Sequence, residues 1–188
     1  MGLNLPRRTK KRFPKRVQAP LVLPIGPDLV WSADFMRDQL YDGRLFRTFN
    51  VLDDYHREAV AIEIDTSITS ERLIRIFETI AEQRPLPEVL RVDNGPEFVS
   101  EKFGKWAQSK GMVLQFIQPG KPNQNAFIER FNRTYRTEVL SAWLFDSLSE
   151  VREATWQWMI EYNEERPHDS LLDHTPQEFL ERHRKLYL

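Results

Sequence analysis

Three acidic residues lie in three different predicted elements, an arrangement that suits metal-dependent phosphodiester chemistry. Asp34 falls in the first predicted strand, Asp93 at the end of the fourth, and Glu129 one turn into a helix. Phosphodiester cleavage needs an activated water or hydroxyl and stabilised charge on the phosphate and the departing oxygen, which a pair of Mg²⁺ ions can provide. About three carboxylates on rigid elements suffice to hold such ions. We therefore take these three residues as candidate catalytic and metal-binding residues.

An aspartate in a strand often only faces solvent and has no catalytic role. On spacing alone, Asp34 could equally be such a residue. Other acidic residues also lie near the three candidates in the sequence. Asp53 and Asp54 are expected to end the second strand at a turn. The other acidic residues near the three candidates are Asp38, Asp42, Asp65 and Glu97.

Composition limits the classes of protein and of metal site. The 188 residues suit one domain, and a hydrophobic fraction of 40% with 12 phenylalanines indicates a packed core. No apolar run approaches a membrane span and the start lacks a secretory signal, so we expect a cytoplasmic protein. The chain has no cysteine, so a metal would be held by oxygen or imidazole, and carboxylates favour Mg²⁺ or Mn²⁺.

Charge is divided unevenly along the chain. Residues 1–27 form a proline-containing arm with seven basic residues, among them Lys10, Lys11 and Arg12, and no acidic one, whereas the remainder has 20 basic and 28 acidic residues. Such an arm is typical of a DNA tether, with a solvated linker as the alternative.

The hydrophobic pattern predicts a mixed sheet with flanking helices. Predicted strands are 29–36, 45–52, 59–65, 88–93 and 112–117, and predicted helices are 70–83, 100–110, 124–140 and 147–165, with a short last helix after Pro176. Asn94-Gly95 favours a tight turn after Asp93, and a supporting hydrogen bond from Asn94 at the site is the alternative role. Asp34 and Asp93 would lie side by side on the assumption that the first and fourth strands are neighbours.

The predicted helix 124–140 has two different faces. Phe127, Phe131 and Tyr135 lie opposite Glu129 at 100° per residue, while Arg133 and Arg136 lie beside it. The polar loop before the helix and these two arginines could contact DNA phosphates, with a flexible capped connection as the alternative. The loop candidates are Lys121, Asn123, Gln124 and Asn125.

Linked motifs around the acidic residues resemble a known family. They are Trp31-Ser-Ala-Asp34-Phe, Asp93-Asn-Gly-Pro-Glu-Phe98 and Pro119-Gly-Lys-Pro-Asn-Gln-Asn-Ala-Phe-Ile-Glu129, with 35 residues between Asp93 and Glu129. Tyr135-Arg-Thr-Glu-Val139 and Tyr162-Asn-Glu-Glu-Arg-Pro-His168 follow. From about residue 2 to 180 the chain resembles insertion-sequence transposases of bacterial family three, which have a retroviral-integrase-like catalytic core.

The resemblance implies an α/β, ribonuclease-H-like fold with a mixed five-stranded sheet and extra C-terminal helices. It implies that Asp34, Asp93 and Glu129 bind two Mg²⁺ ions, for which Mn²⁺ can substitute. The implied reaction is hydrolysis at a transposon end followed by strand transfer, in a homo-oligomer on transposon and target DNA, without a covalent enzyme intermediate. We expect an arm at 1–27, a catalytic core at 28–140 and a C-terminal helical extension at 141–188.

Family members carry helix-turn-helix and coiled-coil parts upstream, so we expect this chain to be a fragment or remnant with the cutting and joining site alone. Two alternatives stay open: an inactive core that only binds DNA or subunits, and a nuclease for RNA–DNA hybrids. His168 could carry protons, but we expect a turn residue packed on a helix. The tryptophans at 106, 143, 156 and 158 are expected in the core or an interface.

Overall fold

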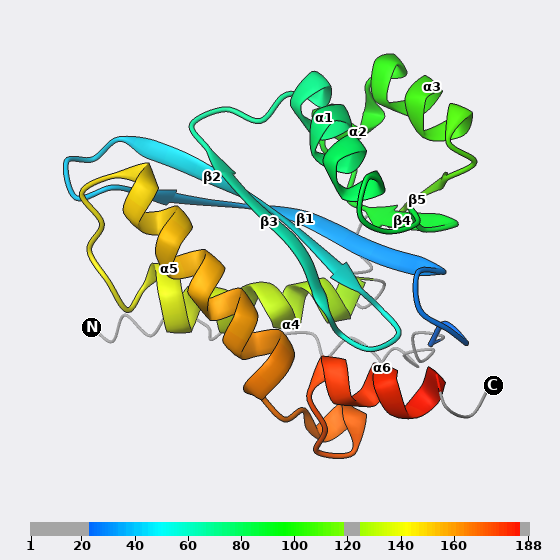
Figure 1. Cartoon of the computed structure of the whole chain (residues 1–188). Coiled ribbons are helices and arrows are strands. Elements are labelled where there is room, and N and C mark those ends of the chain that lie inside the picture. The colour runs from blue at the N-terminus through cyan, green and yellow to red at the C-terminus, as the bar shows by residue number, and fades with distance from the viewer. Residues whose placement is uncertain (1–22, 119–124, 185–188) are drawn as a thin grey trace, which may run out of the picture.

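The computed structural model describes residues 23–118 and 125–184 and contains one mixed five-stranded sheet with helices on both faces (Figure 1). The strand order is β3-β2-β1-β4-β5. The strands are β1 (Val30–Gln39), β2 (Leu45–Asp53), β3 (Ala59–Asp65), β4 (Val89–Val92) and β5 (Val113–Phe116). The first three form the expected antiparallel meander, and β4 and β5 add to β1 in parallel. The predicted ribonuclease-H-like α/β fold agrees with this architecture.

The helices connect and extend this sheet in the predicted order. They are α1 (Ser70–Ala81), α2 (Pro96–Val99), α3 (Glu101–Ser109), α4 (Ala126–Tyr135), α5 (Leu148–Ile160) and α6 (Pro176–Arg184). Wider π-helical turns, η2 (Arg136–Leu140) and η3 (Glu161–Glu165), continue α4 and α5, and a 3-10 turn, η4 (Asp169–Leu171), precedes α6. The sequence did not predict α2 or the π-helical turns.

Capping groups explain where several helices begin. Thr69 and Ser147 accept hydrogen bonds from backbone N–H groups in the first turns of α1 and α5. The Ser147 half of the capping box expected from the sequence is present, with Glu150 N–H donating to Ser147 Oγ at 3.3 Å, while the Glu150 carboxylate accepts from the N–H of Asp146 at 3.0 Å. Pro176 opens α6, where its missing N–H costs no helical hydrogen bond.

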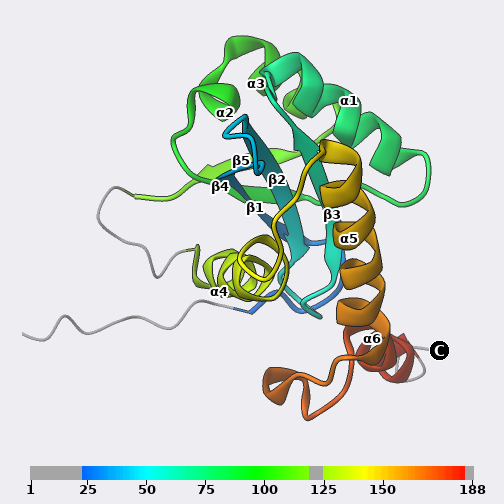
Figure 2. The same cartoon turned by 90° about the vertical axis from the view of Figure 1, so that its left-hand side faces the viewer.

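Two hydrophobic clusters, one on each face, fix the sheet between its helices. Odd-numbered residues of β1, such as Trp31 and Ala33, pack with α1, α2 and α3, whereas Met36 and Leu40 pack with α4 and α5. Figure 2 shows α1 to α3 on one side of the sheet and α4 and α5 on the other. Since side chains alternate along a strand, even-numbered Asp34 faces α4.

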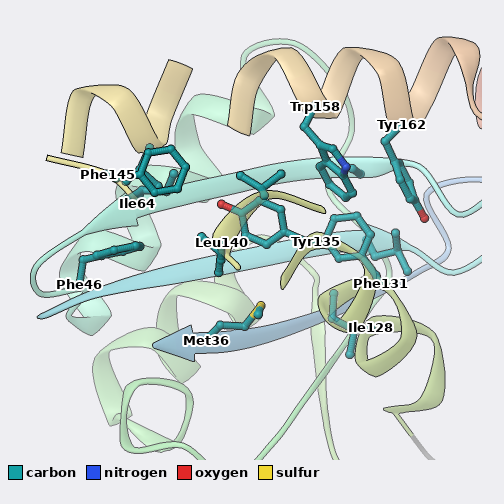
Figure 3. Close-up of a cluster of buried hydrophobic side chains, with 14 of the residues drawn as sticks. Met36, Phe46, Ile64, Ile128, Phe131, Tyr135, Leu140, Phe145, Trp158 and Tyr162 are labelled. Atoms are coloured by element: carbon teal, nitrogen blue, oxygen red, sulfur yellow. The ribbon is translucent and has the colours of Figure 1, made fainter. Parts of the chain in front are cut away.

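The C-terminal helices share the core of the α4 face. In Figure 3, Trp158 and Tyr162 lie over Phe131 and Tyr135. Their rings contact one another, with centroids 5.1 Å apart for Phe131 and Tyr162 and 5.2 Å apart for Tyr135 and Trp158. This packing holds α4 against the sheet, and with it the residues on the opposite face of α4. No helix in residues 23–118 and 125–184 is long and apolar enough to cross a membrane.

Candidate active site

The neighbouring strands β1 and β4 bring Asp34 and Asp93 to the same level of the sheet. Ser32 pairs with Arg91 in this parallel ladder. Asp34 and Asp93 each lie two residues further along their own chain segments, so they lie side by side. The strand adjacency assumed from the sequence is therefore confirmed.

Asp34 is held on the α4 face by two hydrogen bonds. Its Oδ1 accepts from the N–H of Phe35 at 2.8 Å and its Oδ2 accepts from Nδ2 of Asn132 at 2.9 Å. Burial, together with the charges of Asp93 and Glu129, raises the pKa of Asp34 to about 6 against the lowering effect of these hydrogen bonds. Asp34 thus lies in the field of both other candidate carboxylates.

Asp93 is positioned by the turn that leads into α2. Its Oδ1 accepts from the N–H of Gly95 at 2.9 Å, and Pro96 begins the helix at the next residue. A Cβ atom at Gly95 would lie 2.9 Å from this same oxygen, closer than such contacts allow. Glycine is therefore required for the observed position of the Asp93 carboxylate.

Glu129 lies in the first turn of α4 and is exposed. The opposite face of α4 is buried through Ile128, Phe131 and Tyr135, as the two-faced pattern predicted. Packing of that face directs the polar side of the helix toward Asp34, where Asn132 makes its hydrogen bond.

The three carboxylates form a donor set suited to a hard cation, although they are not drawn into coordination geometry. No salt bridge joins any of them to a basic side chain within the described ranges. In the part of the chain that the structure describes, no three acidic or histidine side chains are grouped closely enough to hold an ion. Binding would need side-chain rotation, for which the exposed Glu129 has freedom. Oxygen ligands fit Mg²⁺ and Mn²⁺.

Most of the alternative acidic residues are occupied by other partners. Asp38 pairs with Arg136 at 2.9 Å, Asp42 with Arg44 at 2.6 Å, Asp54 with Arg91, and Glu97 with Arg47. Asp65 accepts from the N–H of Thr66. Among the described residues, Asp34, Asp93 and Glu129 have no basic partner, and of the alternatives listed here Asp65 shares this property.

The turn after β2 forms a buried charged network, consistent with its predicted structural role. Asp53, which ends β2, accepts from the indole of Trp31 at 3.1 Å and lies 3.3 Å from Nδ1 of His56. His56 also contacts Glu58 at 2.8 Å. The pair Asp53–Asp54 therefore supports the turn and the sheet.

The expected DNA-contacting residues are only partly within the described chain. Asn125 has a buried side chain, 2% exposed, and makes no capping bond for α4. Arg133 is exposed, and Arg136 binds both Asp38 and the carbonyl of Arg37. Lys10, Lys11, Arg12, Lys121, Asn123 and Gln124 lie outside the described residues.

Asn94 holds the local backbone. Its Nδ2 donates to the carbonyl of Ile117 at 3.0 Å, which ties the turn after β4 to the end of β5. This contact fits the expected role of the Asn94-Gly95 segment in backbone geometry. The supporting hydrogen bond at the carboxylates comes instead from Asn132.

Sequence reasoning missed Asn132 and Asn50 as site residues. Asn50 lies opposite Asp34 in the β1–β2 ladder, and its Nδ2 donates to Oδ1 of Asn132 at 2.7 Å. Both side chains are buried. Two features of the sequence could have predicted them. Asn132 follows Glu129 by three residues on one helical face, and Asn50 is a polar residue within an apolar strand.

His168 and the tryptophans have varied surroundings. His168 packs against Tyr162 with ring centroids 4.8 Å apart, as expected for a turn residue on a helix. Trp158 is buried and Trp106 packs against a core cluster. Trp143 and Trp156 are 66% and 64% exposed, so they lie outside the core, and the interface part of the expectation stays a prediction for them.

Two family models match the chain, both described as integrase core domain. One covers residues 25–122 and the other residues 110–176. The first covers about half of the chain and contains Asp34 and Asp93, and the second contains Glu129.

Curated relatives include proteins of insertion elements. An insertion element IS407 uncharacterized 31.7 kDa protein of Burkholderia multivorans is 40% identical over 97% of this chain and 66% of its own length. An insertion element IS476 uncharacterized 39.2 kDa protein of Xanthomonas euvesicatoria is 36% identical over 97% of this chain and 53% of its own length. A transposase for insertion sequence element IS904 of Lactococcus lactis is 22% identical over 82% of this chain and 62% of its own length. The chain thus spans between about half and two thirds of these relatives.

Solved structures show the same fold. A simian T-cell lymphotropic virus intasome chain has a TM-score of 0.72 at 17% identity, covering 85% of this chain and 56% of that chain. The HTLV-2 integrase catalytic core domain in complex with magnesium, in its trimeric form, has a TM-score of 0.65 at 17% identity, covering 82% and 97%.

Proposed function

The chain belongs to the integrase core family, a family of polynucleotidyl transferases, and we propose that it is the catalytic core of a DNA transposase. In this proposal Asp34, Asp93 and Glu129 are the catalytic residues and bind two divalent ions. Residues 28–140 form the catalytic core, residues 141–188 extend it with helices that share its hydrophobic cluster, and residues 1–27 form a DNA-binding arm. We keep the cytoplasmic location expected from the sequence as part of the proposal.

The observation that carries this proposal is the electrostatic setting of Asp34. Asp93 and Glu129 both raise the pKa of Asp34, and the described chain offers the three no basic partner. Uncompensated carboxylates in one place are unfavourable unless a cation joins them. Mg²⁺, or Mn²⁺ in its place, bound there would activate the attacking oxygen and stabilise charge on the phosphate.

The chain's own residues would position this centre. The amide of Asn132 orients the Asp34 carboxylate, the N–H of Gly95 holds Asp93, and packing of the apolar face of α4 presents Glu129. Arg133 and the segment before α4, including Lys121, Asn123 and Gln124, would contact DNA phosphates. Asn125 and Arg136 are excluded from this surface because one is buried and the other is paired.

The reaction that we propose has two steps at one site. Water first hydrolyses a phosphodiester at a transposon end, which releases a 3′ hydroxyl. That hydroxyl then attacks a phosphodiester of target DNA and displaces its 3′ oxygen, so the number of phosphodiester bonds is conserved in the second step. Two such events on paired ends would require a homo-oligomer.

A nicking and joining assay tests this function. Labelled duplex DNA is incubated with Mg²⁺ or Mn²⁺ and wild-type protein, Asp93→Asn, Glu129→Gln, or Asp38→Asn as a matched control. We expect products with wild type and Asp38→Asn and a loss of at least about 100-fold in the other two variants. Wild-type rates in either triad variant would contradict the proposal, and preferred cleavage of an RNA–DNA hybrid would indicate a different nuclease.

A further inference from the structure

A pocket of about 300 Å³ lies between α4, the turn after β2 and the segment that follows η3. Four basic side chains line it: Arg57, Arg130, Arg166 and His168. Asp169 is the acidic residue of its lining, and none of the three catalytic candidates takes part. Figure 3 shows Phe131 and Tyr162, which also line the pocket, at one end of the hydrophobic cluster.

Arg57 is a buried cation, and no hydrogen bond or salt bridge within the described part of the chain joins it to an anion. Its side chain is 8% exposed, and its Nη1 has no hydrogen-bond partner among the described residues. The guanidinium lies over the ring of Phe127 at 3.6 Å, while the oxygens of nearby Asp54 already bind Ser32 and Arg91. A buried guanidinium with an unsatisfied donor favours binding of an anion from outside the chain.

The backbone of Arg57 is also unusual. Its φ angle is +60°, in the left-handed region that glycine and asparagine adopt more readily. An arginine at such a position is strained relative to those residues. The local backbone preference therefore does not explain an arginine at this position.

His168 offers a second unsatisfied atom in the same pocket. Its Nε2 is buried without a partner among the described residues, while its ring bonds the backbone of Tyr162. Burial lowers the pKa of His168, and the charges of Arg166, Arg130 and Arg57 lower it further. An anion in the pocket would offset these charges and favour the protonated ring, whose Nε2 could then donate to that anion.

The remaining two arginines differ in availability. Arg166 is paired with Glu138, whereas Arg130 is exposed and follows Glu129 directly on α4. An anion bound at Arg57 and Arg130 would therefore lie on a different side of α4 from Glu129. Guanidinium groups bind phosphate oxygens in a planar, bidentate manner.

We propose that Arg57, Arg130 and His168 form an anion site that binds a backbone phosphate of the DNA, separate from the catalytic carboxylates. This inference rests on the proposed function for its choice of DNA. The position of Arg130 beside Glu129 favours a phosphate of the reacting DNA over a carboxylate of another protein. The site would anchor the duplex while Asp34, Asp93 and Glu129 act on the reacting phosphodiester.

Inorganic phosphate is the first probe, with EDTA present so that no metal contributes. The ring-proton shift of His168 is followed by NMR against pH and phosphate, with sodium chloride at matched ionic strength. We expect phosphate to raise the pKa of His168 in wild type. Arg57→Asn, which suits the positive φ, and the exposed substitution Arg130→Gln should each weaken phosphate binding about tenfold. Arg75→Gln, an exposed change on α1, should bind phosphate as wild type does.

Duplex DNA is the second probe, again in EDTA. The slope of log affinity against log salt should decrease by about one in Arg57→Asn and in Arg130→Gln. Absence of a phosphate effect on His168 in wild type would overturn the anion site. Phosphate binding with an unchanged DNA salt slope in both variants would overturn the assignment to DNA and indicate an acidic protein ligand. Neither readout depends on metal-dependent cleavage, so failure of the catalytic proposal would be seen separately.

Discussion

Asn132 donates a hydrogen bond of 2.9 Å to Oδ2 of Asp34, so the helix that carries Glu129 also fixes the carboxylate of the first strand. Asn50 supports this contact from β2 by donating to Asn132 at 2.7 Å. The hydrogen bond from Asn132 lowers the pKa of Asp34, against the larger raising effect of burial. It therefore favours the ionised form, which is the form that binds a metal ion.

We predict that Asn132→Ala weakens Mn²⁺ binding by about 10- to 100-fold, because Asp34 loses its orienting donor and a proton competes better for it. Calorimetric titration with Mn²⁺ measures the affinity. Asn163→Ala is the matched control, since Asn163 also makes two hydrogen bonds, to the backbone of Ala59, away from the carboxylates. Unchanged Mn²⁺ affinity in Asn132→Ala would rule out this positioning role.

Gly95 offers a test of how closely Asp93 is held. A Cβ at Gly95 would meet Asp93 Oδ1 at 2.9 Å, whereas a Cβ at Gly104 would have no atom within 4 Å. We predict that Gly95→Ala displaces the Asp93 carboxylate and reduces metal-dependent nicking about 10- to 100-fold, because small displacements of catalytic groups are costly. The melting temperature should change little. Gly104→Ala should keep wild-type nicking, and equal activity in the two variants would refute the argument.

Asp93 and Glu97 lie in the same short motif, but removing the charge of each should affect different properties, metal binding for Asp93 and stability for Glu97. Glu97 is half-buried and bound to Arg47, so Glu97→Gln should destabilise the fold by about 1–3 kcal/mol and leave metal binding intact. Asp93→Asn should abolish metal binding with a smaller effect on unfolding. Urea unfolding and Mn²⁺ titration on both variants distinguish them. Loss of metal binding in Glu97→Gln would mean that the wrong acidic residue was assigned.

His56 predicts a dependence of stability on pH. Burial lowers its pKa, but hydrogen bonds with Asp53 and Glu58 outweigh burial and raise the pKa to about 9 from 6.5. Protonated His56 therefore stabilises the folded state. This stabilisation is complete below pH 6.5 and is lost as the pH rises through 9. From the size of the shift we expect a loss on the order of 3 kcal/mol over that range.

Urea unfolding between pH 6 and pH 9.5 measures this loss. His56→Gln should be less stable at pH 6 and should show a much smaller decrease toward pH 9.5. His174→Gln, which changes a histidine outside this network, should keep the wild-type pH dependence. An equal dependence in wild type and His56→Gln would contradict the assignment to His56.

The sequence predicted most of the fold because local patterns determine it. Phe131 and Tyr135 opposite Glu129 predicted which face of α4 packs, and Ser147 and Pro176 marked helix starts. The short helix α2 was missed because Asn94-Gly95 before Pro96 also suits a turn. The π-helical turns leave no periodic signal, since each is a single turn.

The candidate site was predicted only in part, because some of its contacts depend on tertiary structure. The three carboxylates were chosen from chemistry and from motifs. Asn50 and Asn132 meet Asp34 only when β2 and α4 pack on β1, which no local pattern specifies. The pocket at Arg57 and His168 likewise joins residues from distant parts of the chain.

In the proposed function, Asp34, Asp93 and Glu129 bind divalent ions together. The most direct measurement is the anomalous scattering of Mn²⁺ soaked into crystals of the protein. We predict Mn²⁺ within about 2.0–2.3 Å of carboxylate oxygens from these three residues, with side-chain rotation of Glu129. Strong anomalous peaks at Asp38, Asp54 or Glu97 instead, or no peak at the triad at saturating Mn²⁺, would contradict the claim.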